Sequence, residues 1–233
     1  MMPMRPVLIL GLIGLATGCG GAGQIRLPKP SGFVPGEAGA AAEWARSTLP
    51  DGARDIRFRW QFRDDKGAAG GRGRIRLAVP DSARLDVQGP LGTGRAAALV
   101  AGDTAVWAQP EDDVKRLVPN YPLFWALLGV VRAPANGAAV LRSADPELIA
   151  WRYHRGPDTL DYVWMAGTPD RLIAQVREGG RQVGTVETVF GPDGQPVSAR
   201  LIVPDAPARL DITFSSIQKA TSFDPDTWTP PQP

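Results

Sequence analysis

The chain has 233 residues, enough for one domain with a large core or for two small ones. Its 26 lysine and arginine residues nearly balance its 24 aspartate and glutamate residues, and no dense basic run occurs along the sequence, which argues against a nucleic-acid-binding protein. Glycine (27) and proline (23) are frequent, which favours short strands joined by turns over long helices.

Residues 1–18 have the pattern of an export signal. Arg5 and the α-amino group form a short positive region, and the apolar run 7–15 is shorter than the roughly 20 residues that span a bilayer. The run ends in Leu15-Ala-Thr-Gly-Cys19, which resembles the lipobox of bacterial lipoproteins and contains the only cysteine. This resemblance implies that Cys19 is acylated, and Gly20 implies sorting to the outer membrane. The alternative is an ordinary signal peptide followed by an unrelated cysteine.

The next segments predict a tether and then a single folded domain. Residues 19–36 are rich in glycine and proline and have no apolar period, which is typical of a tether. Residues 37–49 place Ala41, Trp44 and Ala45 on one face and predict the first helix. No internal repeat or boundary follows, so residues 37–233 are expected to form one domain.

Strands dominate the remainder. From Asp55 the apolar period becomes two, and Ile56, Phe58, Trp60 and Phe62 share one face of a long strand. Residues 64–71 predict a polar, glycine-rich loop. Turn signals every 8–12 residues indicate an antiparallel meander. Further strands are predicted at 75–79, 83–88, 95–101, 103–108, 147–153, 159–166, 171–177, 181–190, 197–203 and 208–217.

Two segments interrupt the strands. The acidic run 111–113 predicts a solvated turn, because no histidine or further carboxylate follows at the spacing of metal ligands. Residues 121–131 predict a second helix, with Pro122 in the first turn, where proline is tolerated. This helix is apolar nearly all round, so it must be buried or lie against apolar material. The tail 223–233 is expected to be extended along a sheet edge.

The pattern predicts a mainly β fold, with one curved antiparallel sheet of about eleven strands and two helices. Most strands are apolar on one face only, and twisted sheets of this size curl or split. If the helices cover part of the concave face, the remainder is an apolar cavity suited to acyl chains. The alternative is a sandwich whose strands fill one another's core. The predicted lining of the cavity is Phe58, Trp60, Phe62, Trp107, Phe124, Trp125 and Trp164.

Residues for catalysis are scarce. The only histidine, His154, lies in a predicted strand and has no serine or cysteine motif to serve as a base. No nucleophile elbow, zinc-protease motif or paired-cysteine spacing occurs. We therefore expect neither an enzyme nor a bound cofactor or metal.

One turn carries a resemblance to a known family. The strand 83–88 runs into Pro90-Leu91-Gly92, and such a turn leaves Leu91 at its tip. This strand and turn resemble those of LolB-like outer-membrane lipoproteins, whose protruding leucine matches Leu91. The helix that begins at Tyr121 is also similar to a helix of that family. The resemblance implies an open half-barrel with helices on its concave face, and a membrane-inserting loop formed by residues 90–92.

The resemblance also implies a function. The chain would be anchored by lipid to the periplasmic face of the outer membrane, where it would bind the acyl chains of lipoproteins or lipids and help to insert them. Its partners would be acylated lipoproteins or lipids and a LolA-like periplasmic carrier, and the protein would be a monomer. A rival hypothesis is a structural or interaction lipoprotein of an envelope complex, with a filled core and no ligand cavity.

Overall fold

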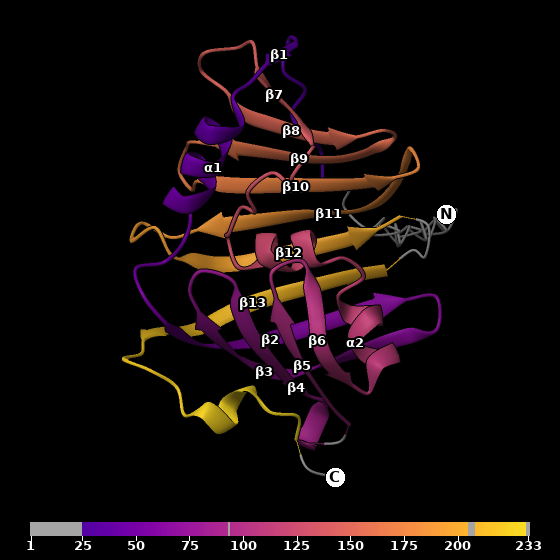
Figure 1. The fold of residues 1–233 in the computed structure, drawn as a ribbon. Helices are drawn as coiled ribbons and strands as arrows, with labels where there is room; N and C mark the ends of the chain where they lie inside the picture. Colours follow the sequence, from indigo (N-terminus) through magenta and orange to yellow (C-terminus); the bar gives the residue numbers. More distant parts are fainter. Residues whose placement is uncertain (1–24, 93, 205–207, 232–233) are drawn as a thin grey trace, which may run out of the picture.

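The computed structural model describes residues 25–92, 94–204 and 208–231, except for the side chain of Leu91. These residues form one antiparallel sheet of thirteen strands in the order β1-β7-β8-β9-β10-β11-β12-β13-β2-β3-β4-β5-β6 (Figure 1). Strands β1 and β6 are free edges, so the sheet does not close into a barrel. The prediction of a mainly β fold with one open antiparallel sheet is confirmed, with thirteen strands in place of about eleven.

The strands are β1 (Phe33–Pro35), β2 (Arg54–Asp64), β3 (Gly67–Ala78), β4 (Ser82–Gln88), β5 (Arg95–Ala101), β6 (Thr104–Gln109), β7 (Ala139–Ser143), β8 (Ile149–Arg155), β9 (Asp158–Met165), β10 (Arg171–Glu178), β11 (Arg181–Phe190), β12 (Pro196–Val203) and β13 (Ala208–Lys219). The α-helices are α1 (Ala38–Ser47), α2 (Glu111–Leu117) and α3 (Tyr121–Leu127). Two short 3₁₀ helices are η1 (Pro90–Gly92) and η2 (Pro225–Trp228).

The sheet consists of two meanders that meet at its centre. Strands β2 to β6 pair in chain order, and so do β7 to β13. The last strand then returns to the second strand, with Ile217 opposite Ile56 and Ile212 opposite Trp60. This β13–β2 seam joins the two meanders through strands that are far apart in the sequence.

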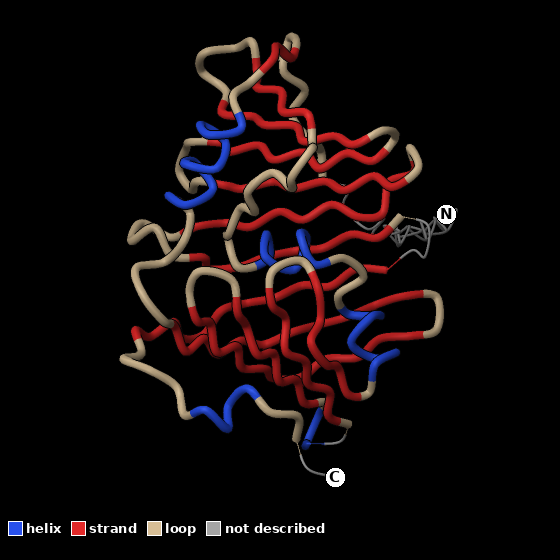
Figure 2. Tube along the Cα trace, in the orientation of Figure 1, coloured by secondary structure: helices blue, strands red, loops and turns tan. Residues whose placement is uncertain are grey.

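Alternation along each strand gives the sheet two unlike faces. The inner face carries Phe58 and Trp60, whereas the outer face carries the arginines that alternate with them. The helices lie over the inner face of the sheet (Figure 2). On the inner face, α1 packs Trp44 against Trp151 and Tyr162, with ring centroids 6.4 and 6.2 Å apart. None of the helices in the described residues is long and apolar enough to cross a membrane.

Helix α3 is the centre of the inner layer. The Asn120 side chain accepts a hydrogen bond from the Leu123 amide at 3.3 Å and so caps its first turn. Two polar contacts hold the buried helix in place: the Thr188 hydroxyl donates to the Ala126 carbonyl at 2.6 Å, and the Trp125 indole donates to the Gly102 carbonyl at 2.7 Å. The predicted second helix therefore exists and is buried, but it ends at Leu127 and not at residue 131.

Three local expectations were wrong. The acidic run 111–113 is the first turn of helix α2, where carboxylates interact favourably with the helix dipole. The predicted polar loop 64–71 is mostly strand, because β2 and β3 pair from Asp64 opposite Gly67 onward. Strands β1 and β7 were missed, and β1 falls within the segment expected to be a tether, because each is short and lacks a clear alternation.

The C-terminal segment crosses the outer face of the sheet and not its edge. The Arg84 guanidinium on β4 donates to the carbonyls of Thr227 and Thr229, at 2.7 and 3.1 Å. The Trp107 indole on β6 donates to the Trp228 carbonyl at 3.1 Å. The segment thus covers the part of the outer face where Leu99 is buried between β4 and β6.

Candidate functional site

The aromatic row of β2 forms the floor of the inner face. Phe58, Trp60 and Phe62 are all at most 8% exposed. Phe58 is opposite Gly73 on β3, where a Cβ atom would lie 2.1 Å from the Phe58 ring. Gly73 therefore allows this ring to lie against the β3 backbone, and the Trp60 indole donates to the Arg72 carbonyl at 3.3 Å.

The middle of this interior is filled. The helices α2 and α3 leave a cavity of about 20 Å³, whose walls include Phe58, Trp60, Phe124 and Leu117. A cavity of that size holds about one water molecule, whereas sites for small ligands measure about 300–1,000 Å³. The middle of the inner face therefore holds no open apolar cavity in this conformation, because α3 and the end of α2 occupy the space.

A first opening to the interior, the turn mouth, lies beside η1. It has a volume of about 240 Å³ and is lined by Trp60, Phe62, Pro90, Arg116 and Leu117, among others. Trp60 and Leu117 also line the small cavity, so they separate the mouth from the interior. The turn mouth thus brings together two predicted aromatic residues and the predicted membrane-inserting turn.

One arginine of helix α2 holds the helix over the turn mouth. The Arg116 guanidinium donates to the Asp64 carboxylate at 2.8 Å and lies 5.0 Å from the centre of the Phe62 ring. Asp64 is the last residue of β2, and its side chain is only 8% exposed. Burial raises the pKa of Asp64, but hydrogen bonds from Arg116 and the Lys66 amide more than offset this, so the pKa lies below its ordinary value.

A second opening, the helix mouth, lies at the other end of the interior. It has a volume of about 490 Å³ and is lined by residues from α1, the end of α3 and the β11–β12 turn. Trp44, Trp164 and Phe190 contribute its largest apolar surfaces, and the Trp164 and Phe190 rings lie 4.9 Å apart. Ile149, at 45% exposed, extends this apolar surface outward.

Six of the seven predicted lining residues divide into three groups. Phe58, Trp60, Phe62 and Phe124 lie around the small cavity or the turn mouth, and Trp164 lines the helix mouth. Trp125 is fully buried but is directed toward the Gly102 carbonyl and lines neither mouth.

Trp107 does not join the other aromatic residues. The register places it opposite Leu99, which is opposite Arg84, and therefore on the outer face. There the Arg84 guanidinium lies 5.4 Å from the centre of its ring. Cys19 and the side chain of Leu91 lie outside the described residues, so lipidation and membrane insertion stay predictions.

Other residues of the site had weak signals in the sequence. Trp44 lies on the apolar face of the predicted first helix, but nothing in the pattern associates it with Trp164 or Phe190. Arg116 had no signal, because α2 was expected to be a turn. The described residues contain no cluster of three or more histidine, cysteine or carboxylate side chains that could hold a metal. The expectation of no enzymatic activity stays a prediction.

Comparisons with known proteins give distant likenesses only. No family model matches the chain, and no curated protein matches it. Solved structures that are similar to the chain have low identity to it. A LolA superfamily protein from Nitrosomonas europaea has 9% identity and a TM-score of 0.36, covering 84% of this chain and 98% of that one.

The second similar structure is a putative outer membrane lipoprotein-sorting protein domain from Vibrio parahaemolyticus, with 7% identity and a TM-score of 0.35. It covers 82% of this chain and 97% of that one. The third is a DUF1329 family protein from Desulfovibrio piger, with 7% identity and a TM-score of 0.40, covering 82% of this chain and 95% of that one.

Proposed function

We propose that this chain is a lipid-anchored protein on the periplasmic face of the outer membrane, where it binds acyl chains of lipoproteins or lipids and helps to insert them. The observation that carries the proposal is the turn mouth. Its walls are largely apolar, it lies beside the Pro90–Gly92 turn, and it shares Trp60 and Leu117 with the interior cavity. An acyl chain entering there would pass directly from the turn to the apolar interior.

Entry requires helix α2 to move, since the interior is otherwise filled. Helix α2 has seven residues, of which only Val114 is fully buried. Its main polar attachment to the sheet is the contact of Arg116 with Asp64 and Phe62. In the proposed mechanism α2 is a lid, and its displacement removes Leu117 from between the mouth and the cavity.

The lid is tested by adding a fluorescent fatty-acyl probe to the full chain. Arg116→Ala removes the ion pair with Asp64 and the cation–π contact with Phe62, so the probe should bind several-fold faster. Lys115→Ala is the matched control, because Lys115 pairs with Glu111 on the exposed side of the same helix. No probe binding by the folded wild-type chain would exclude the acyl-binding function.

Insertion is tested at Leu91. A leucine that enters the acyl region of a membrane gains about 1.5–3 kcal/mol from burial, and a charged side chain there would be penalised. Leu91→Glu should therefore block transfer of bound cargo to liposomes, whereas Leu91→Phe should retain most transfer. Equal transfer by the two variants, or a clear fall in melting temperature for Leu91→Glu, would contradict the role of this turn.

The filled interior also supports the rival function. A structural lipoprotein of an envelope complex needs a packed core and no ligand, and the 20 Å³ cavity fits that description. The two functions differ in one result, because only the acyl-binding protein should carry lipid when it is purified and examined by native mass spectrometry. Both include anchoring through Cys19, for which Cys19→Ser should change membrane fractionation.

A further inference from the structure

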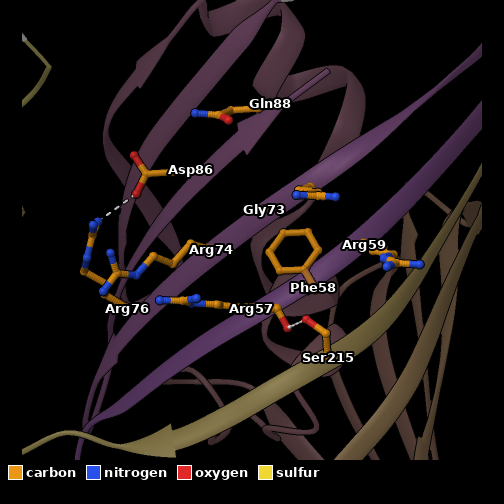
Figure 3. Close-up of a pocket in the computed structure, with 10 residues that line it drawn as sticks. Arg57, Phe58, Arg59, Gly73, Arg74, Arg76, Asp86, Gln88 and Ser215 are labelled. Carbon is orange, nitrogen blue, oxygen red and sulfur yellow. Dashed lines mark hydrogen bonds and ion pairs between the residues drawn. The ribbon is translucent and has the colours of Figure 1, made fainter. Parts of the chain in front are cut away.

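Five arginines gather on the outer face of two neighbouring strands. Strand β2 contributes Arg57 and Arg59, and strand β3 contributes Arg72, Arg74 and Arg76 (Figure 3). The register sets Arg57 directly opposite Arg74 and Arg59 directly opposite Arg72. Like charges in directly opposed positions of a sheet destabilise it, so this arrangement has a cost that packing alone does not explain.

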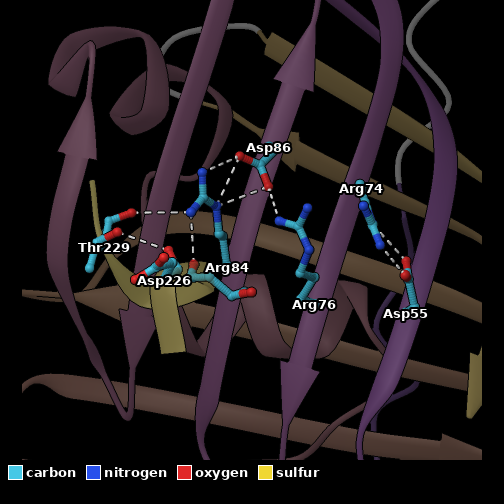
Figure 4. Close-up of polar contacts among 8 residues, drawn as sticks. Asp55, Arg74, Arg76, Arg84, Asp86, Asp226 and Thr229 are labelled. Carbon is cyan, nitrogen blue, oxygen red and sulfur yellow. Dashed lines mark hydrogen bonds and ion pairs between the residues drawn. The ribbon is translucent and has the colours of Figure 1, made fainter. Parts of the chain in front are cut away.

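The carboxylates on this face are already engaged. Asp55 accepts hydrogen bonds from Arg74, and Asp86 is shared by Arg76 and Arg84 (Figure 4). Among the described residues, no carboxylate lies within ion-pair distance of the other three arginines of the group. These three, Arg57, Arg59 and Arg72, are also the exposed ones. They are available to an anion from outside the chain.

The arginines surround a groove of about 700 Å³, larger than either mouth of the inner face. Gln88 and Ser215 add polar groups to its walls, and the backbone at Gly73 lies within it (Figure 3). The basic surface continues beyond the groove, because Arg63 on β2 is directly opposite Arg209 on β13.

We propose that this outer-face groove binds the phosphate groups of anionic phospholipids. Planar guanidinium groups match phosphate oxygens in bidentate geometry, and two strands offer them from both sides of the groove. The proposal does not depend on acyl binding, since the arginines lie on the outer face and, of the groove's lining residues, only Phe58 also lines the small interior cavity.

The path of the chain favours a membrane surface over a free phosphate compound. The segment that precedes β1 passes behind the sheet, on the side opposite the helices (Figure 1). Strand β1, which follows this segment, also contacts the outer face, because the Arg152 guanidinium, which pairs with Asp161, lies 4.4 Å from the centre of the Phe33 ring. The chain thus enters the fold from the face that carries the groove.

The test is calorimetric titration of the full chain, held in a neutral detergent, with dihexanoyl-phosphatidylglycerol. Dihexanoyl-phosphatidylcholine has the same acyl chains without net charge and measures any binding at the apolar mouths. We expect Arg57→Gln/Arg72→Gln to weaken the phosphatidylglycerol-specific binding by about tenfold or more, since two charged contacts are lost. The same charge change at Arg46→Gln/Arg142→Gln, on exposed arginines outside the groove, should leave it within about twofold.

Stability provides an independent measurement. Removing Arg57 and Arg72 relieves two like-charge pairs, so the melting temperature should stay constant or rise. A fall in melting temperature together with unchanged lipid binding would show that the arginines are structural and overturn the proposal. Equal loss of binding in the two double variants would overturn it too, and so would tighter binding of inorganic phosphate than of phosphatidylglycerol.

Discussion

Alternate residues of strand β2 face two different environments. Phe58 and Trp60 lie under the helices and are almost inaccessible to water, whereas their neighbours Arg57 and Arg59 lie in an open basic groove. The side chains of the inner face are packed against other parts of the chain, whereas the exposed arginines of the outer face are not. The apolar face first suggests a ligand site, but over β2 it is filled by the helices and opens only at its two mouths, whereas the charged face is open over β2 itself.

The largest expected difference between the faces is in stability. Phe58→Ala should lower the free energy of unfolding by about 3–5 kcal/mol, because it removes a buried ring and leaves a cavity. Arg57→Ala, one residue away, should change it by less than about 0.5 kcal/mol, as exposed substitutions do. Urea denaturation of both variants measures the contrast. Similar losses of stability in the two variants would mean that the two faces differ less than the burial of their side chains indicates.

A smaller effect is expected where the inner rings meet β3. Gly73→Ala places a Cβ atom 2.1 Å from the Phe58 ring and should cost about 1–3 kcal/mol through overpacking. Phe58→Leu, added to Gly73→Ala, should cost less than the sum of the two single changes, because the smaller side chain vacates that position. Strict additivity in denaturation experiments would refute this contact.

The smallest effect concerns the ion pair on the outer face. The Arg74 hydrogen bond holds the pKa of Asp55 below its ordinary value, in spite of partial burial. A lowered folded-state pKa stabilises the fold above the unfolded pKa of about 4, and this stabilisation is lost as the pH falls through the folded value. The loss should be below about 1 kcal/mol, because the pair is partly exposed.

Arg74→Gln should remove that part of the acid dependence. Melting temperatures of the wild-type and variant chains, compared between neutral pH and about pH 3, measure it. Arg46→Gln is a suitable control, because Arg46 is exposed on α1 and Asp55 pairs with Arg74 instead. If the acid dependence is unchanged in Arg74→Gln, the loss of stability at low pH arises from other carboxylates.

The sequence predicted the strands better than their partners or faces. Alternation such as that of Phe58, Trp60 and Phe62 is a local property, and it correctly identified the inner face of β2. Trp107 has a similar local pattern but lies on the outer face, because its orientation depends on pairing with β5, including the register shift between Leu99 and Val100. Periodicity defines two faces of a strand and does not say which face meets the helices.

The features missed at the site have a common physical cause. Helix α2 is only seven residues long, so two turns give too few positions for a helical period to be visible. The glycines of β3 have reasons that exist only in the folded structure: a Cβ atom on Gly73 would meet the Phe58 ring, and one on Gly71 would meet the Gln88 carbonyl. The arginine groove was equally invisible, since its members belong to two strands that become neighbours through their register.

The β13–β2 seam has a consequence for how the protein is made. Its strands are separated by about 150 residues of chain, and Ile56 meets its partner Ile217 only after nearly the whole polypeptide is present. Contacts so distant in sequence slow folding, because a long loop must close before they contribute. During the proposed export from the N-terminus, the aromatic row of β2 would stay exposed until the last strand arrives. Truncation before Lys219 should therefore leave this row exposed for longer.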